Sequence, residues 1–114
     1  MFLYVVKHDV GAKWTVIIIS NIKMSLQFTG RVAVISGAGR GLGATYAREL
    51  AKRGALVVVN DLDETEIIAE INNAGGKAVY NGDSVEDPEA IIKCAIDNFG
   101  KVDIVINNAG MTRD

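Results

Sequence analysis

The chain has 114 residues, 49% of them hydrophobic, and a formal net charge of −2 at pH 7. This length allows one domain with a packed core, and the near-neutral charge gives no indication of nucleic acid as a partner. With a single histidine, His8, and a single cysteine, Cys94, a disulfide within the chain is excluded and a zinc site is not expected. A lone cysteine in a helical pattern suits a reducing compartment, and we expect the cytoplasm.

Residues 1–23 are interpreted as an extension upstream of a domain that spans residues 24–114. The extension holds two short apolar runs, 2–6 and 16–19, separated by charged residues. Neither run approaches the roughly 20 apolar residues that span a bilayer, so no membrane association is expected. The charges interrupt the apolar core that a secretory signal needs, and the absence of arginine argues against a mitochondrial transit peptide. A misplaced start codon or an added segment is the favoured interpretation.

A glycine-rich turn follows the first predicted strand of this domain, residues 31–35. The apolar character of this strand is typical of a strand buried on both faces of a parallel sheet. The turn opens a predicted helix that ends at Gly54. Glycines admit an anion close to the backbone, and a helix N-terminus directs free N–H groups toward it, so this unit predicts a phosphate site. The helix's apolar face is formed by Ala44, Ala47, Leu50 and Ala51. The candidate binding residues of the turn are Ser36, Gly37, Arg40, Gly41, Leu42 and Gly43.

Three further strands are predicted at residues 55–60, 77–80 and 102–106, and helices alternate with them. Asp87-Pro88 is typical of a helix start, and Gly100 of a helix end. The other helix is expected to place Ile67, Ile68, Ile71 and Ala74 on one face and to close at Gly75-Gly76. This alternation predicts the α/β class with a doubly wound parallel sheet of Rossmann type. Right-handed crossovers give the strand order 3-2-1-4, with the switch point between strands 1 and 4.

Asp61 ends the second predicted strand, 20 residues after Gly41. A carboxylate at this position can accept hydrogen bonds from both ribose hydroxyls of an adenosine, and its charge would repel a 2′-phosphate. We therefore expect NAD rather than NADP as the cofactor. The alternative role for Asp61 is to cap the helix that follows.

The spacing Gly37-x-x-x-Gly41-x-Gly43 resembles that of the short-chain dehydrogenase/reductase family, with Ser36 where the family more often has threonine. The turn lacks the Gly-Lys-Ser/Thr of a P-loop and the strict Gly-x-Gly-x-x-Gly spacing. The segment 107–110, Asn-Asn-Ala-Gly, is similar to a family motif that follows a buried strand. The resemblance covers residues 26–114 and implies an N-terminal, cofactor-binding half of an incomplete Rossmann domain.

The resemblance also implies roles for residues beyond the turn. Asp83 and Ser84 follow the third strand, and Asp83 matches the family acid that accepts from the adenine amino group; a solvated turn residue or a helix cap is its alternative role. Asn107, Ala109 and Gly110 are implied to line the cofactor's ribose. Arg40 weighs against NAD, since family members that use NADP often carry a basic residue there. The family is usually homo-oligomeric.

Within the family, residues 59–62 and 83–87 resemble the 3-hydroxyacyl-CoA dehydrogenase part of peroxisomal multifunctional enzyme type 2. Residues 111–114 are similar both to that enzyme and to 3-oxoacyl-carrier-protein reductases. This resemblance implies the interconversion of 3-hydroxyacyl and 3-oxoacyl thioesters by the complete protein. It also makes the peroxisome the alternative to the cytoplasm.

The sequence offers no catalytic residue. In the family a tyrosine takes the substrate proton, and it is helped by a lysine four residues later and by a serine. The residues four positions after Tyr4, Tyr46 and Tyr80 are His8, Leu50 and Ser84. We expect the catalytic half to be missing, and the alternative function is a non-catalytic nucleotide-binding or subunit-pairing module. Residues 104–106 would then form an open apolar edge, and residues 15–19 are a candidate strand to cover it.

Overall fold

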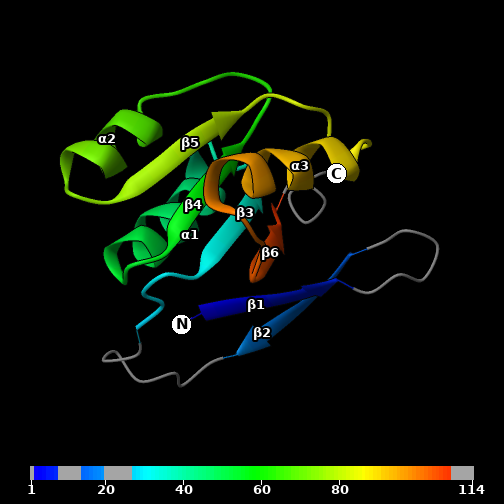
Figure 1. Cartoon of the computed structure of the whole chain (residues 1–114), viewed down its shortest axis with the longest axis horizontal. Coiled ribbons are helices and arrows are strands. Elements are labelled where there is room, and N and C mark those ends of the chain that lie inside the picture. The colour runs from blue at the N-terminus through cyan, green and yellow to red at the C-terminus, as the bar shows by residue number, and fades with distance from the viewer. Residues whose placement is uncertain (1, 8–13, 20–26, 109–114) are drawn as a thin grey trace.

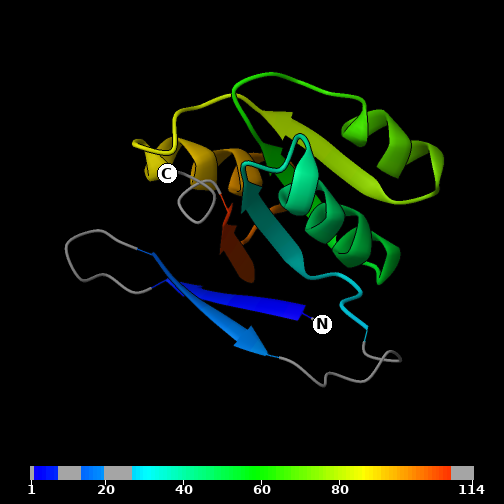
Figure 2. The same ribbon diagram turned by 180° about the vertical axis from the view of Figure 1, so that it is seen from behind.

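The structure is a computed structural model that describes residues 2–7, 14–19 and 27–108. Its main sheet has four parallel strands, and the predicted α/β class and strand order are confirmed. In spatial order these strands are β5 (Lys77–Asn81), β4 (Leu56–Asn60), β3 (Val32–Ser36) and β6 (Ile104–Asn107). The helices α1 (Gly41–Lys52) and α2 (Ile67–Asn73) cover one face of the sheet, and α3 (Pro88–Phe99) covers the other (Figures 1 and 2).

The central strand β3 is buried along its whole length. Alternate side chains of a strand point to opposite faces. Ala33 and Ile35 therefore pack with α1 and α2, while Val32 and Val34 pack with α3. Residues 31–35 were predicted to form a strand buried on both faces, and the structure confirms this for residues 32–35. Arg31 is an exception, because its charged side chain is exposed and β3 begins at Val32.

The helices follow the predicted patterns with one exception. In α1 the predicted apolar face is buried, and Gly54 after its end has a φ of +97°. The Asp87 side chain caps α3 by accepting from the Ala90 N–H at 3.3 Å, and Gly100 adopts the left-handed conformation after it. The placement of Ala74 on the buried face of α2 is wrong. Helix α2 ends at Asn73, so Ala74 is already leaving the helix and is exposed.

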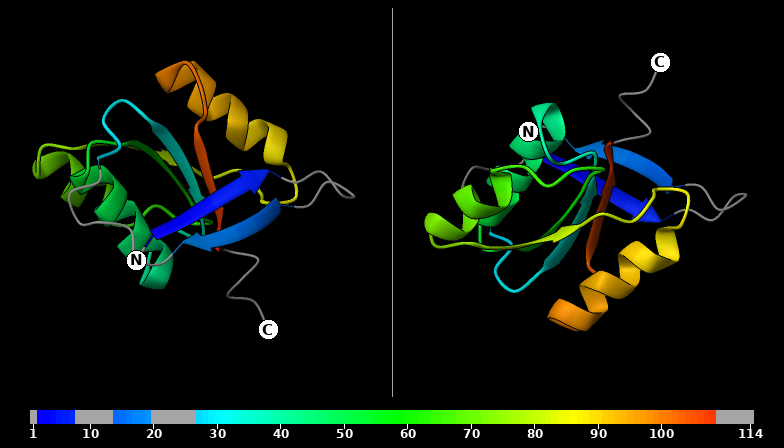
Figure 3. Two further views of the ribbon diagram at one scale, coloured as in Figure 1. Left: turned by 90° about the horizontal axis from the view of Figure 1, so that it is seen from below. Right: turned by 90° about the horizontal axis from the view of Figure 1, so that it is seen from above.

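The first two strands form a separate antiparallel sheet, in which β1 (Phe2–Lys7) pairs with β2 (Trp14–Ile19). β1 lies nearer to β6 than β2 does, and the hairpin crosses β6 (Figures 1 and 3). The prediction that residues 15–19 cover the β6 edge as a strand is therefore wrong. Pairing with the adjacent segment closes a short loop, which costs less entropy than pairing with a strand far away in sequence. Among the described residues, no strand other than β3 is hydrogen-bonded to β6.

Two further findings concern membrane crossing and the outer edge of the sheet. In the part of the chain that the structure describes, no helix has the length and apolar content needed to cross a bilayer. The β6 side chains predicted to lie on an open edge are largely covered, since Ile104 and Ile106 are buried and Val105 is half-buried.

Candidate functional site

The carboxyl ends of the strands border a cleft of about 690 Å³, a size typical of small-molecule sites. The cleft is formed by the turn after β3, the loops after β4 and β5, and the end of β6. Seven of the predicted binding residues meet there: Gly37, Arg40, Gly41, Leu42, Asp61, Asp83 and Ser84. The other described residues in its lining are Asn60, Leu62, Asp63, Val85, Glu86 and Asn108.

The other predicted residues that the structure describes are not in this lining. Ser36 donates from Oγ to Asn107 Oδ1 at 3.0 Å, which joins β3 to β6 at the switch point of the sheet. Both residues line a separate small cavity of about 40 Å³ on the α3 face. Gly43 is buried in the first turn of α1. Ala109 and Gly110 lie outside the described residues.

The geometry of the glycine turn explains the spacing of its glycines. Gly37 and Gly41 have φ values of +61° and +60°, in the left-handed region that glycine enters without steric cost. At Gly43 a Cβ atom would lie 2.2 Å from the Gly37 carbonyl oxygen and 2.7 Å from Asn108 Nδ2. The turn therefore packs against the start of α1 with no room for a side chain at this position.

The N-terminus of α1 has the properties of an anion site. Within the described part of the chain no side chain caps this helix, and its first turn holds no acidic residue. By contrast, α3 is capped by Asp87. Since the first N–H groups of a helix need acceptors from outside the helix, those of Gly41 and Leu42 suit a phosphate group in the cleft.

Asp61 connects the end of β4 to the glycine turn. Its Oδ2 accepts from the Gly39 N–H at 2.8 Å, and its Oδ1 accepts from the Leu62 N–H at 2.7 Å. A Cβ at Gly39 would lie 2.8 Å from the same Oδ2, so a side chain there would displace the Asp61 carboxylate. The alternative that Asp61 caps the next helix is wrong, because α2 begins at Ile67 with Glu66 before it. Gly39, the second of the four glycines in residues 37–43, was not among the predicted binding residues.

A network of side-chain amides holds Asp83 at the other side of the cleft. Asn60 donates from Nδ2 to Asn81 Oδ1 and to the Asp83 carbonyl oxygen, both at 2.8 Å. Asn81 in turn donates to Asp83 Oδ2 at 2.8 Å. The alternative that Asp83 is a solvated turn residue holds for its exposure to solvent. It does not account for the hydrogen bond from Asn81 that holds the Asp83 carboxylate in place. Both asparagines end neighbouring strands in register, and neither was among the predicted binding residues.

The cleft carries mostly negative charge. Of its described lining residues, Arg40 alone is basic, against the carboxylates of Asp61, Asp63, Asp83 and Glu86. Tyr80 lies beside this region and donates from its hydroxyl to the carbonyl oxygens of Asp61 and Leu62, each at 3.1 Å. Desolvation, followed by the negative charges of Asp63, Glu64 and Asp61, raises the pKa of Tyr80 above its ordinary value. An additional phosphate near Asp61 would meet the same repulsion.

Two exposed apolar side chains in the cleft were also missed. Leu62 is 82% exposed and Val85 is 45% exposed, and they belong to the loops after β4 and β5. Exposed aliphatic groups beside carboxylates can cover the flat face of a base while the polar groups bind its edge and its sugar. Among the described residues, no group of three or more histidine, cysteine or acidic side chains is placed to hold a metal ion.

Residues 31–114 match the short chain dehydrogenase family. Peroxisomal multifunctional enzyme type 2 of Mus musculus is 50% identical over 101 residues, which cover 78% of this chain and 14% of that enzyme. Peroxisomal hydratase-dehydrogenase-epimerase of Saccharomyces cerevisiae is 52% identical over 103 residues, 79% of this chain and 11% of that enzyme. The chain thus spans only a small part of the length of these relatives.

Solved structures of dehydrogenases are similar to this chain in both fold and sequence. A short chain dehydrogenase from Mycobacterium avium has a TM-score of 0.69 at 37% identity, covering 75% of this chain and 35% of that one. A 7α-hydroxysteroid dehydrogenase, solved with NADH and 7-oxo glycochenodeoxycholic acid, has a TM-score of 0.68 at 34% identity, covering 72% and 34%.

Proposed function

We propose that the cleft of this chain, which belongs to the short-chain dehydrogenase family, binds the adenosine diphosphate half of NAD. The observation that carries the proposal is the hydrogen bond between Asp61 Oδ2 and the Gly39 N–H. It brings a carboxylate suited to a ribose beside a turn and helix N-terminus suited to a diphosphate. Gly43 supports the fit between these residues and the diphosphate. A side chain at this position would push the glycine turn away from the start of α1.

Each part of the ligand has residues of matching chemistry. The N–H groups of Gly41 and Leu42 would hold the diphosphate, and Asp61 would accept from the ribose hydroxyls. Leu62 and Val85 would cover the adenine ring, with the Asp83 carboxylate accepting from its amino group. When bound, NAD supplies the hydride acceptor of the reaction.

The preference for NAD over NADP rests on charge. A 2′-phosphate would add negative charge next to Asp61, in a cleft where Arg40 is the single cation among the described lining residues. Arg40 precedes α1 and is exposed, so it remains the residue that could attract this phosphate. Asp61 supports the choice of NAD, because its carboxylate is held in place by two backbone N–H groups.

Titration of the 114-residue chain with NADH and NADPH tests this proposal. We expect tighter binding of NADH by the wild type, and a smaller difference between the cofactors in Asp61→Asn, which keeps an acceptor oxygen and loses the charge. Asp61→Ala should weaken NADH binding by about tenfold, the equivalent of about 1.4 kcal/mol. Asp97→Asn, an exposed carboxylate on α3 outside the cleft, is the matched control. Equal affinities for both cofactors in the wild type and in both Asp61 variants would contradict the role of Asp61.

For the complete protein we propose the interconversion of 3-hydroxyacyl and 3-oxoacyl thioesters. The likeness to peroxisomal multifunctional enzymes supports this choice. The segments 59–62 and 83–87 support it as well, and residues 60–62 and 83–86 of them line the cleft. A protein that carries this cleft together with the serine and Tyr-x-x-x-Lys of the family should reduce NAD with a 3-hydroxyacyl-CoA and not with a simple secondary alcohol. The peroxisomal names of these relatives favour the peroxisome over the cytoplasm as its location, which microscopy of a tagged full-length protein would test.

The second candidate function is a non-catalytic nucleotide-binding or subunit-pairing module. One observation favours it: no tyrosine in the 114 residues is followed four positions later by lysine. Such a module would bind NADH without turnover. Size-exclusion chromatography with and without a full-length subunit would test for pairing, and homo-oligomerisation is the expectation from the family.

A further inference from the structure

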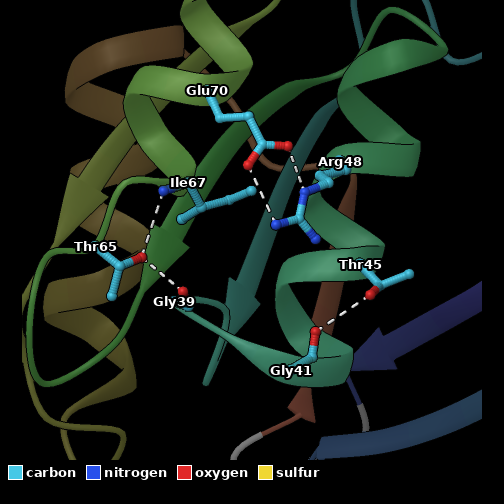
Figure 4. Close-up of polar contacts among 7 residues, drawn as sticks. All are labelled: Gly39, Gly41, Thr45, Arg48, Thr65, Ile67 and Glu70. Atoms are coloured by element: carbon cyan, nitrogen blue, oxygen red, sulfur yellow. Dashed lines mark hydrogen bonds and ion pairs between the residues drawn. The ribbon is translucent and has the colours of Figure 1, made fainter.

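We infer that Thr65 is a positioning residue for the phosphate-binding turn, an inference that rests on the proposed function. Thr65 lies in the loop between β4 and α2. Its Oγ1 donates to the Gly39 carbonyl oxygen at 2.6 Å and accepts from the Ile67 N–H at 3.5 Å (Figure 4). A single hydroxyl therefore joins the glycine turn to the start of α2, across 26 residues of sequence.

Both backbone polar groups of Gly39 are bound by this one loop. Asp61 accepts from its N–H at 2.8 Å, and Thr65 donates to its carbonyl oxygen. Gly39 is buried, so these two bonds replace contacts with water. Neither group of Gly39 is left for a ligand, and the N–H groups at the start of α1 remain as the donors of the turn.

The direction of the Gly39 carbonyl matters for an anion. A carbonyl oxygen that faced the diphosphate would repel it, because both carry negative charge. The Thr65 hydroxyl holds this oxygen toward the β4–α2 loop instead. Thr65 thereby acts on the diphosphate through the backbone, without a contact of its own to the ligand.

The support for Thr65 is itself rigid. Ile67, whose N–H donates to the Thr65 hydroxyl, has a side chain that is only 2% exposed in the core. Helix α2 is also tied to α1 by Arg48, which donates from Nε to Glu70 Oε2 at 2.5 Å and from a terminal nitrogen to Oε1 at 3.2 Å (Figure 4). The turn is thus positioned relative to the core through α2, as well as through its own helix.

The test compares two probes, ADP and adenosine, which differ in the diphosphate. Thr65→Val removes the hydroxyl at nearly constant shape, and Thr65→Ser keeps it. Thr45→Val is the matched control, since the Thr45 hydroxyl donates to Gly41 O at 3.2 Å inside α1 and is exposed (Figure 4). Dissociation constants are measured by calorimetry on the 114-residue chain.

We expect Thr65→Val to weaken ADP binding by about 5- to 10-fold, in line with the loss of one hydrogen bond, and to change adenosine binding less than twofold. Thr65→Ser and Thr45→Val should stay within about twofold of the wild type for both probes. If Thr65→Val does not fold, Thr65→Ala lacks the same hydroxyl and carries the same expectation.

The outcomes separate the two proposals. If the wild type binds neither probe, the proposed function fails. If the wild type binds ADP and the variant without the hydroxyl binds it equally well, the function stands and the inference about Thr65 is overturned. Equal losses for ADP and adenosine would also overturn it, because they indicate a general structural role rather than positioning of the turn.

Discussion

The Asn108 side chain donates from Nδ2 to the Gly37 carbonyl oxygen at 3.0 Å, across 71 residues of sequence. Asn108 follows β6 and Gly37 follows β3, so this bond fixes the glycine turn to the neighbouring strand of the sheet. Gly43 lies against the same two groups. The turn therefore packs against the end of β6 and the start of α1, and its shape depends on both.

Gly43→Ala should destabilise the fold far more than Gly41→Ala. A Cβ at Gly43 would lie 2.2 Å from the Gly37 carbonyl oxygen, whereas at Gly41 it would meet nothing within 4 Å. We expect a loss of about 3 kcal/mol or more in the free energy of unfolding for Gly43→Ala. Gly41→Ala should lose only about 1–2 kcal/mol, from its positive φ. Urea denaturation of both variants would measure this, and equal losses would contradict the packing argument.

Leu62→Ser should weaken nucleotide binding without changing stability. The Leu62 side chain is 82% exposed, so little apolar surface is lost from the folded protein. Covering it with a base would bury that surface, and we expect the Kd for AMP to rise by about 3- to 10-fold in the variant. Ile96→Ser is the matched control, because Ile96 is 51% exposed on α3 and outside the cleft. Equal effects of the two variants on AMP binding would contradict a base site at Leu62.

Asp103 should make the fold sensitive to acid. Its Oδ2 accepts from the Val32 N–H at 2.9 Å, and this bond, with Lys101 and Arg31 nearby, lowers the pKa of Asp103 below its ordinary value. The carboxylate therefore stabilises the fold above its unfolded pKa of about 3.9, and this contribution is lost as the pH falls toward the folded pKa.

Asp103→Asn should accordingly lose about 1.5–3 kcal/mol of stability at pH 7 and show a smaller further loss between pH 5 and 3 than the wild type. Asp97→Asn serves as the control, since Asp97 forms an exposed pair with Lys93 at 2.7 Å, a kind of pair that contributes little. Thermal unfolding across this pH range is the measurement. Parallel pH profiles for Asp103→Asn and the wild type would rule out the role of Asp103.

Deletion of residues 1–23 should lower solubility and thermal stability. Strand β1 lies against β6, and no second strand of the described residues is hydrogen-bonded to the outer edge of β6. An apolar strand edge without cover promotes pairing between chains. We expect a lower Tm and aggregation on concentration of residues 24–114, measured by scanning fluorimetry and light scattering. Unchanged values would show that the hairpin does not protect this edge.

The 114-residue chain should bind NADH and yet show no NAD-dependent oxidation of a 3-hydroxyacyl-CoA. The tyrosine that takes the substrate proton in this family is followed four positions later by lysine, and no tyrosine of this sequence meets that condition. The rate of NADH formation is measured by absorbance, with a complete short-chain dehydrogenase that oxidises 3-hydroxyacyl-CoA as the positive control. Turnover by the 114-residue chain would indicate a proton acceptor other than a tyrosine with a lysine four positions later.

Local signals in the sequence were sufficient for the α/β class, the strand order and the position of the cleft. Buried strands are read from continuous apolar runs, as at residues 31–35, and helix ends from pairs such as Asp87-Pro88. The spacing from Gly37 to Gly43 was equally informative, because positive φ and close packing act on the residue itself. Buried strands, helix ends and positive φ depend on the residue and its neighbours in the chain, which a single sequence displays.

Only the tertiary structure decided which distant groups meet. Three hydrogen bonds exist because the strands lie side by side. Asp61 accepts from the Gly39 N–H, Thr65 donates to the Gly39 carbonyl oxygen, and Asn108 donates to the Gly37 carbonyl oxygen. The pairing of β2 with the adjacent β1, where cover for the distant β6 was expected, is likewise a choice between possible partners. A residue's type and spacing determine what it can donate or accept, but its partner depends on the three-dimensional packing of segments that lie far apart in sequence.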